Sequence, residues 1–299
     1  MISVFGSANM DLVAYVEAAP GLGETVTGRE FRTVPGGKGA NQAIAAARAG
    51  AEVVFLGAVG DDAFGPELRR TLAGAGVDVS GLRTVPGPSG IAQIVVDGQG
   101  GNSIIVVPGA NGAVTAPSEA ELEVIARSDV LLLQLELPIE AVTAAARAAR
   151  AAGTTVILTP APVQPLPDEL LDAVDILVAN EHEAAAITGL ADHEEAVREL
   201  RTRVGWVIIT LGARGALTAA PGAGPAVHVR APEVRAVDTT AAGDTFVGAL
   251  AAAHVERQSP DRAVRFAGAA AALSVQREGA STSMPGRAEI DQSLARSDG

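Results

Sequence analysis

The sequence contains no cysteine, which excludes a disulfide framework, a thiolate nucleophile and a cysteine-ligated metal centre. Histidine is scarce as well, and the separations between the four histidines match no metal-ligand spacing. Basic residues are outnumbered: the formal net charge is −13, which argues against a general nucleic-acid-binding protein. A phosphorylated ligand is still compatible with this charge, because backbone N–H groups and a divalent cation hold phosphates locally.

Long apolar runs are also lacking, because those present are alanine-rich and interrupted by arginine or glycine, so no segment resembles a membrane span. Met1 is followed directly by a strand-like Ile-Ser-Val-Phe rather than by a basic and then apolar signal segment. We therefore expect a cytoplasmic protein that binds neither membrane nor nucleic acid. With 299 residues, 48% of them hydrophobic, the chain is able to bury a sizeable core.

Buried strands alternate with helices along most of the chain, which predicts an α/β fold with a central, mainly parallel sheet flanked by helices. No repeat, linker or charge run marks a second domain, so residues 1–299 are expected to form one unit. The expected strands are 2–6, 53–59, 129–135, 154–159, 175–178, 206–210 and an extended run at 231–237. The expected helices are 43–49, 64–75, 119–126, 139–152, 193–204, one starting near 243, 260–276 and 287–296.

Two segments, roughly 12–34 and 90–107, break this alternation with residues that alternate between apolar and polar. Runs 91–97 and 102–107 are joined by Gly98-Gln99-Gly100-Gly101, which is typical of a hairpin. We expect the two segments to pair into a small separate β-sheet that acts as a lid over the ends of the central strands.

The stretch 238–249 combines a small-residue turn with the start of a helix and places Asp244 in the first turn. Free backbone N–H groups and the helix dipole make such a turn an anion site. Because a carboxylate would repel the anion, Asp244 is better explained as a base that takes a proton from a group attacking the anion. The alternative is an ordinary helix start, where aspartate and threonine are common.

A second glycine-rich stretch, Gly36-Gly37-Lys38-Gly39, opens the helix at 43–49. It is not a P-loop, since Gly39 follows the lysine where that motif requires serine or threonine. Glycines on both sides of Lys38 suit backbone packed against a bound molecule, and the alternative is a flexible turn with a solvated lysine.

Polar side chains gather where strands end, and open α/β sheets bind their ligands at this edge. They are Asn9, Asp11, Glu136, Asn180, Glu183 and Asp244. Neutral and acidic hydrogen-bonding groups suit a polyhydroxylated substrate, whereas a helix N-terminus suits a phosphoryl group. Together they indicate phosphoryl transfer onto a hydroxyl.

The chain resembles the ribokinase/phosphofructokinase-B family of carbohydrate kinases over essentially its whole length. Six segments carry the resemblance, in order: 6–11, 36–43, 134–136, 180–183, 210–215 and 238–246. The resemblance implies a central sheet between helices and a β lid that often forms a dimer interface. It also implies transfer of a phosphoryl group from ATP to the 5-hydroxyl of D-ribose, giving D-ribose 5-phosphate and ADP.

The resemblance further assigns roles to individual residues. Sugar hydroxyls would be held by Asn9, Asp11, Gly37, Lys38, Asn41, Glu136 and Asp244, the last also the base. The anion hole would be Ala241, Ala242 and Gly243. ATP would contact Asn180, Thr210, Leu211, Gly212, Ala213, Arg214, Gly215, Gly243, Asp244 and Gly268. Glu183 would act on Mg²⁺ through water, and a K⁺ site would use Asp238, Thr240, Ser274, Arg277, Gly279 and Ser283.

Two positions depart from the family pattern: Thr159 stands where asparagine is common, and Ala179 where proline precedes Asn180. Alternative readings are a kinase for another sugar or a nucleoside, and a sugar-binding regulator without catalysis. The Gly-Gly-Lys-Gly-Ala-Asn-Gln run with Glu136 argues against a nucleoside, and the presence of Gly243 and Asp244 argues against lost catalysis. A dinucleotide-dependent oxidoreductase is disfavoured, because no Gly-x-Gly-x-x-Gly follows the first strand.

Overall fold

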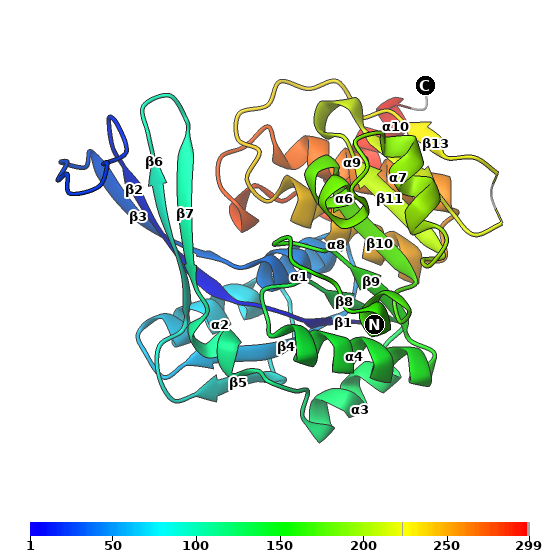
Figure 1. Ribbon diagram of the computed structural model, residues 1–299, viewed down its shortest axis with the longest axis horizontal. Coiled ribbons are helices and arrows are strands. Elements are labelled where there is room, and N and C mark those ends of the chain that lie inside the picture. The colour runs from blue at the N-terminus through cyan, green and yellow to red at the C-terminus, as the bar shows by residue number, and fades with distance from the viewer. Residues whose placement is uncertain (223, 298–299) are drawn as a thin grey trace.

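A nine-stranded sheet runs through the computed structural model of the chain, which describes residues 1–222 and 224–297 (Figure 1). Neighbouring strands are parallel from β5 to β11, and β12 and β13 continue the sheet in antiparallel fashion. The predicted mainly parallel sheet is thus confirmed. In spatial order the strands are β13 (Val227–Val229), β12 (Ala216–Ala219), β11 (Trp206–Thr210), β10 (Ile176–Asn180), β9 (Thr155–Leu158), β8 (Val130–Leu133), β1 (Ile2–Phe5), β4 (Val53–Gly60) and β5 (Leu82–Val85).

Helices cover both faces of this sheet, and each face has its own apolar core. Successive residues of β1 point to opposite faces, so Val4 joins one core and Phe5 the other. One face packs against α1 (Lys38–Arg48), α2 (Phe64–Gly74), α8 (Ala242–Val255), α9 (Pro260–Ser274) and α10 (Arg287–Ser297). The other packs against α3 (Glu119–Arg127), α4 (Ile139–Ala152), α5 (Asp168–Leu171), α6 (Glu181–Thr188) and α7 (His193–Leu200). No helix in the described part of the chain is long and apolar enough to cross a membrane.

A separate four-stranded sheet extends from one side of the molecule and corresponds to the predicted lid (Figure 1). Its order is β3 (Glu30–Gly36), β2 (Asn9–Tyr15), β6 (Gly90–Val96) and β7 (Asn102–Val107), with β2 and β6 parallel. Strand β2 begins at Asn9, so Asn9 and Asp11 belong to the lid rather than to the polar end of a central strand. Two of the residues predicted to hold the sugar therefore lie in the lid itself.

Several elements differ from the prediction. Residues 231–237 belong to neither sheet, because Pro232 lacks the N–H that a ladder needs and the segment instead borders a cavity. Helix α1 starts at Lys38, earlier than expected, and β8 ends at Leu133, which leaves Glu136 beyond the strand. Strands β12 and β13 were not predicted, because the former is a four-residue, alanine-rich run and the latter is only three residues long, and such short runs carry little strand signal.

Candidate active site

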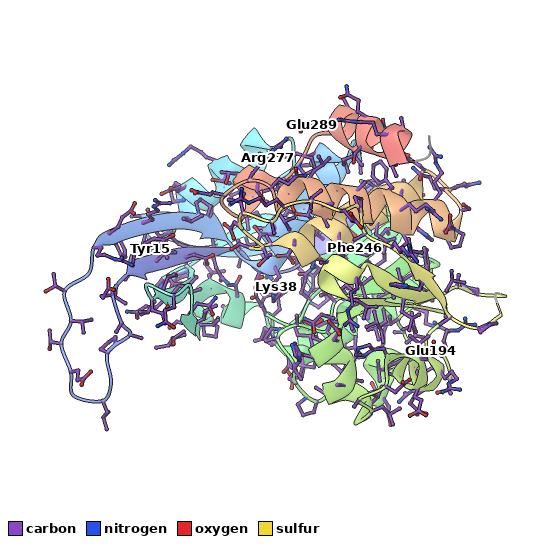
Figure 2. All side chains as sticks on the ribbon, turned by 90° about the horizontal axis from the view of Figure 1, so that it is seen from above. Tyr15, Lys38, Glu194, Phe246, Arg277 and Glu289 are labelled. Atoms are coloured by element: carbon purple, nitrogen blue, oxygen red, sulfur yellow. The ribbon has the colours of Figure 1, made fainter. Side chains whose placement is uncertain are left out.

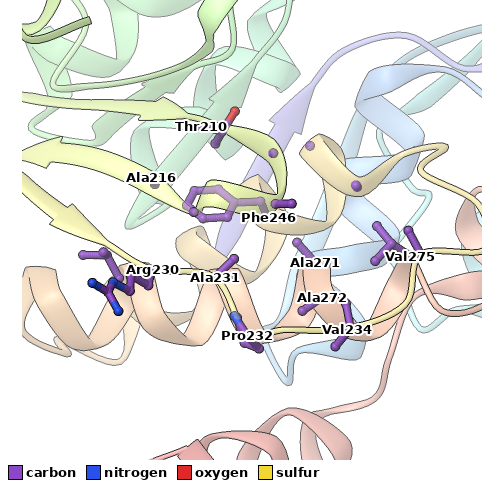
Figure 3. A pocket seen from close by; sticks show the side chains of 18 of the residues that line it. Thr210, Ala216, Arg230, Ala231, Pro232, Val234, Phe246, Ala271, Ala272 and Val275 are labelled. Carbon is purple, nitrogen blue, oxygen red and sulfur yellow. The ribbon is translucent and has the colours of Figure 1, made fainter.

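Two neighbouring cavities lie at the carboxyl ends of the central strands, where an open α/β sheet binds its ligands. The larger has a volume of about 400 Å³ and lies between the β11–β12 turn, residues 229–236 and helices α8 and α9 (Figure 3). The smaller, of about 210 Å³, is lined by side chains that include Lys38, Asn180, Glu183 and Asp244. Both cavities touch Thr210 and Gly243, so a ligand in one would meet a ligand in the other at the start of α8.

Asp244 lies in the first turn of α8 with only 9% of its surface exposed. Its Oδ2 accepts a hydrogen bond from Asn41 Nδ2 at 3.2 Å, and its Oδ1 accepts one from Gln42 Nε2 at 3.1 Å. Burial raises the pKa of Asp244 to about 6, although Lys38 and the two amides favour its charged form. A carboxylate with this pKa is ionised near neutral pH yet able to accept a proton.

The start of α8 leaves room for an anion. Ala241 has a left-handed backbone with φ 57°, a strained conformation for alanine, and no side chain caps the helix. The Ala242 N–H donates to the Thr239 carbonyl, whereas helix geometry leaves the N–H groups of Gly243 and Asp244 without partners in their own helix. A Cβ atom at Gly243 would have no neighbour within 4 Å, so the approach is open.

The Asn9 amide is held in one orientation by Asn111, which lies in the 3-10 helix η1 (Gly109–Ala113). Asn111 Nδ2 donates to Asn9 Oδ1 at 2.6 Å, and the Asn111 side chain also bonds both backbone groups of Ala8. Gly90 makes this contact possible, since a Cβ there would lie 2.3 Å from Asn9 Oδ1. Asn9 is thus fixed at the junction between β1 and the lid.

Three charged side chains face one another beside Asp244. Burial raises the pKa of Asp11 to about 7, with Glu136 and Asp244 adding to the rise and Lys38 opposing it. Burial alone would lower the pKa of Lys38, but the carboxylates of Asp244 and Glu136 outweigh it and raise that pKa. Glu136 accepts hydrogen bonds from Ser7 Oγ and from the Lys38 backbone N–H, the latter at 3.0 Å. Figure 2 shows Lys38 at the junction between the lid, marked by Tyr15, and α8, marked by Phe246.

The glycines around Lys38 are explained by packing against the protein itself. Gly37 has φ 93°, and a Cβ there would lie 2.8 Å from the Asn9 nitrogen. A Cβ at Gly39 would lie 2.6 Å from the Ser7 nitrogen. The structure shows a close approach of these glycines to the β1–β2 connection, and the predicted contact with a bound molecule stays a prediction.

Comparison with known proteins decides the family. Residues 1–287 match the family described as pfkB family carbohydrate kinase. The ribokinase of Haemophilus influenzae is 42% identical to the chain, with 96% of each sequence covered. The chain belongs to the pfkB family of carbohydrate kinases.

Two further relatives of this carbohydrate kinase bear on its site. The solved structure of Arabidopsis thaliana ribokinase, complexed with ribose and ATP, is 38% identical, covers 98% of each chain and has a TM-score of 0.93. The deoxyribokinase of Salmonella typhi is 34% identical over 98% of each sequence. The ribokinase-like fold expected from the sequence is therefore confirmed.

The larger cavity of the kinase collects most of the residues predicted to contact ATP. Its walls are mainly apolar, with the Phe246 ring on one side and Val275 on another (Figure 3). Leu211 is instead buried in the core, and Arg214 pairs with Glu181, so neither side chain lines the cavity. The predicted residues that do line it are Thr210, Gly212, Ala213, Gly215, Gly243 and Gly268.

Asn180 and Glu183 form a capping box at the start of α6. The Glu183 carboxylate accepts from the Asn180 backbone N–H and from its Nδ2, both at 2.8 Å. Burial raises the pKa of Glu183, although the Asn180 N–H and Lys38 counteract that rise. The described residues contain no group of three acidic or histidine side chains placed to hold a metal. A Mg²⁺ ion that keeps its waters needs only one or two carboxylates, so Glu183 fits that limited role.

The two segments predicted to hold a monovalent cation, around residues 238–240 and 275–279, meet beyond the end of α9. Asp238 accepts from the Thr240 N–H at 2.9 Å and from the Gly279 N–H at 2.8 Å, which joins the two predicted segments. These bonds keep the pKa of Asp238 low despite its partial burial. Arg277 pairs with Glu289 of α10, so its charge is already compensated (Figure 2). The hydroxyl hydrogens of Ser274 and Ser283 are donated to backbone carbonyls nearby, which leaves their oxygens as acceptors.

Four residues that form hydrogen bonds around Asp244 and Asn9 were not predicted: Gln42, Asn111, Gln134 and Thr159. Gln42 and Gln134 lie within motifs that carried the family resemblance, which was a usable signal. Thr159, noted only as a departure, accepts a hydrogen bond from Gln42 Nε2 at 3.3 Å. Asn111 sits among small residues after a strand, with no sequence signal of its role.

Proposed function

We propose that this carbohydrate kinase transfers the γ-phosphoryl group of ATP to the 5-hydroxyl of D-ribose, giving D-ribose 5-phosphate and ADP. The observation that carries the proposal is the placement of Asp244. This buried carboxylate lies between a cluster of sugar-compatible polar groups and the open start of a helix. The similarity to ribokinases over nearly the whole chain supports ribose as the acceptor.

In the proposed mechanism Asp244 accepts the proton of the attacking hydroxyl as the oxygen attacks phosphorus. The backbone N–H groups of Gly243 and Asp244 stabilise charge that develops on the transferred group. Asn41 Oδ1 is buried and has no hydrogen-bond partner among the described residues, so a sugar hydroxyl would satisfy it. The remaining proposed sugar contacts are Asn9, Asp11, Gly37, Lys38 and Glu136.

The nucleotide would occupy the larger cavity, with its phosphates directed through the shared opening at Gly243. Glu183, held by Asn180, would contact the waters of Mg²⁺. When bound there with ATP, Mg²⁺ would neutralise part of the negative charge on the phosphates. A K⁺ ion near Asp238 would bind carbonyl and hydroxyl oxygens of the joined segments and would steady the turn that precedes α8.

We further propose that the lid closes over the sugar and pairs with a second copy of the chain. Strand β7 is exposed along its whole length, and Ile105 and Phe31 expose 64% and 62% of their surface. An apolar sheet face of this kind favours a partner surface. Hydrogen exchange in β2 and β6 should slow when ribose is added. Light scattering should report a dimer, and a strictly monomeric species would exclude pairing.

The deciding experiment measures ADP release with a panel of pentoses, hexoses and nucleosides for the wild type and for Asp244→Asn. We expect ribose to give the highest kcat/KM. The variant should lose at least about 10²-fold in kcat, the lower range for a positioned base, while calorimetry still detects ribose binding. Near-normal turnover by the folded variant would remove Asp244 from this role. ADP release with none of the acceptors would favour a sugar-binding regulator.

A second candidate is 2-deoxyribose as the acceptor, which the 34% identical deoxyribokinase favours. The two sugars differ by a single hydroxyl, so the discrimination depends on whether a buried group such as Asp11 is left unpaired. A kcat/KM for 2-deoxyribose equal to or above that for ribose would select this candidate.

A further inference from the structure

Two glutamines behind the catalytic carboxylate form a chain of hydrogen bonds. Gln134 Nε2 donates to Gln42 Oε1 at 2.6 Å, and Gln42 Nε2 donates to Asp244 Oδ1 at 3.1 Å. Gln42 and Gln134 are 0% and 1% exposed, and neither borders the two cavities described above. Because both side chains are closed off from solvent, their amides are placed to act on Asp244 and not on a bound sugar.

The direction of this chain is fixed by what each group is able to accept or donate. An ionised Asp244 only accepts, so Gln42 must turn its Nε2 toward Asp244 and its Oε1 away. That buried Oε1 then needs a donor, which Gln134 Nε2 provides. Without Gln134 the Gln42 Oε1 would be buried without a donor, and only the bonds that Nε2 donates to Asp244 and to Thr159 Oγ1 would hold the Gln42 amide.

The surroundings of Gln134 support this assignment. A Cβ at Gly6 would lie 2.2 Å from Gln134 Oε1, so glycine leaves the space that the amide occupies. Gln134 Oε1 is buried and has no partner among the described residues, so the chain of donors begins there. An amide at such a position is better explained by the bond that it donates than by filling space.

We propose that Gln42 and Gln134 are positioning residues that hold the Asp244 carboxylate in the orientation needed to accept the proton of the sugar hydroxyl. The inference rests on the proposed role of Asp244 as the base. Gln42 acts on Asp244 directly, and Gln134 acts only through Gln42.

The test uses variants that keep side-chain length but remove the amide. Gln42→Met should lower kcat about tenfold at pH 8 and should move the acidic limb of kcat upward by about one pH unit. The limb moves upward because the variant loses a hydrogen bond that favours the charged carboxylate, while Lys38, Glu136 and Asp11 still face it. KM for ribose and for ATP should stay within about twofold, since the fully buried Gln42 side chain is out of reach of either ligand.

Gln134→Met should also move the acidic limb of the kcat profile upward, but by less than Gln42→Met does. In the Gln42→Met background it should have no further effect, because its only route to Asp244 is gone. Carbon-13 NMR titration of the Asp244 carboxyl compares the same variants without a turnover assay. The Asp244 signal is assigned by its disappearance in Asp244→Asn. If Gln42→Met does not fold, Gln134→Met alone decides the question by the same limb and titration.

Thr154→Val is the matched control. It removes a buried hydroxyl with two backbone partners just before β9, whereas Thr159, which Gln42 contacts, follows that strand. If the Gln42→Met profile coincides with this control, or if ribose KM rises while the acidic limb stays, the positioning role is wrong. Additive effects of the two methionines would exclude Gln134 acting through Gln42. Full turnover by Asp244→Asn would instead refute the proposed base, so the two failures are distinguishable.

Discussion

Replacing Asp11 with asparagine should stabilise the sugar-free protein above neutral pH. Burial and the carboxylates of Glu136 and Asp244 raise the pKa of Asp11 from 3.8 to about 7 in the folded protein. A raised folded-state pKa means that stability is fully present below the unfolded value near 3.8 and is lost as pH rises through about 7. A neutral asparagine escapes that loss.

The magnitude follows from the size of the shift. About three pKa units at about 1.4 kcal/mol each set an upper limit of about 4 kcal/mol, and partial exposure reduces this to about 2–4 kcal/mol at pH 8. Urea unfolding at pH 5, 6, 7 and 8 should show the advantage of Asp11→Asn over the wild type growing up to pH 7 and then levelling.

Two controls define the result. Glu123→Gln removes one exposed carboxylate of α3 and so corrects for the change in net charge. Calorimetry should show that Asp11→Asn binds ribose far more weakly than the wild type while ATP binding is retained. An advantage that is absent at pH 8, or constant from pH 5 to pH 8, would refute the reasoning. Equal losses of ribose and ATP affinity would show that Asp11 does not select the sugar.

Three further outcomes follow from the contacts described above. Asn111→Leu frees the amide of Asn9, so ribose KM should rise about tenfold with ATP KM unchanged in steady-state assays; an equal rise in both would contradict it. Gly248→Ala places a Cβ 2.6 Å from Ala45 Cβ, so urea unfolding should show a loss of about 1–3 kcal/mol as α1 and α8 separate; unchanged stability would exclude this packing argument. Turnover at constant ionic strength should be highest in potassium, lower in sodium and lowest in a bulky organic cation, and equal rates would remove the cation from the mechanism.

Sequence reasoning located the main elements because they obey simple rules. Helix α4 occupies the predicted residues 139–152, and α3 begins with the hydrogen-bonded capping box of Ser118 and Glu121. The prediction of a strand at 231–237 was wrong, because a run of apolar residues that borders a cavity has the same sequence pattern as a strand. Local pattern does not distinguish a segment that pairs from one that lines a pocket.

The site was predictable where a residue type implies its chemistry, and less so where partners come from distant elements. The position of Asp244 beside a helix start was visible in the sequence, whereas its bonds to Asn41 and Gln42 of α1 depend on tertiary packing. The pairing of Arg277 with Glu289 likewise depends on where α10 lies. No local sequence pattern predicted the hydrogen bond from Asn111 to Asn9, because the two residues lie about a hundred positions apart in the chain.

The order of residues around the site also governs when it becomes complete during synthesis. Asn9, Lys38 and Glu136 leave the ribosome early, whereas Asp244 and the open start of α8 come much later. Helix α8 then packs directly on α1, with Gly248 against Ala45. If the proposed roles hold, the groups proposed to bind the sugar would be synthesised before the proposed base, and phosphoryl transfer would have to wait until α8 docks.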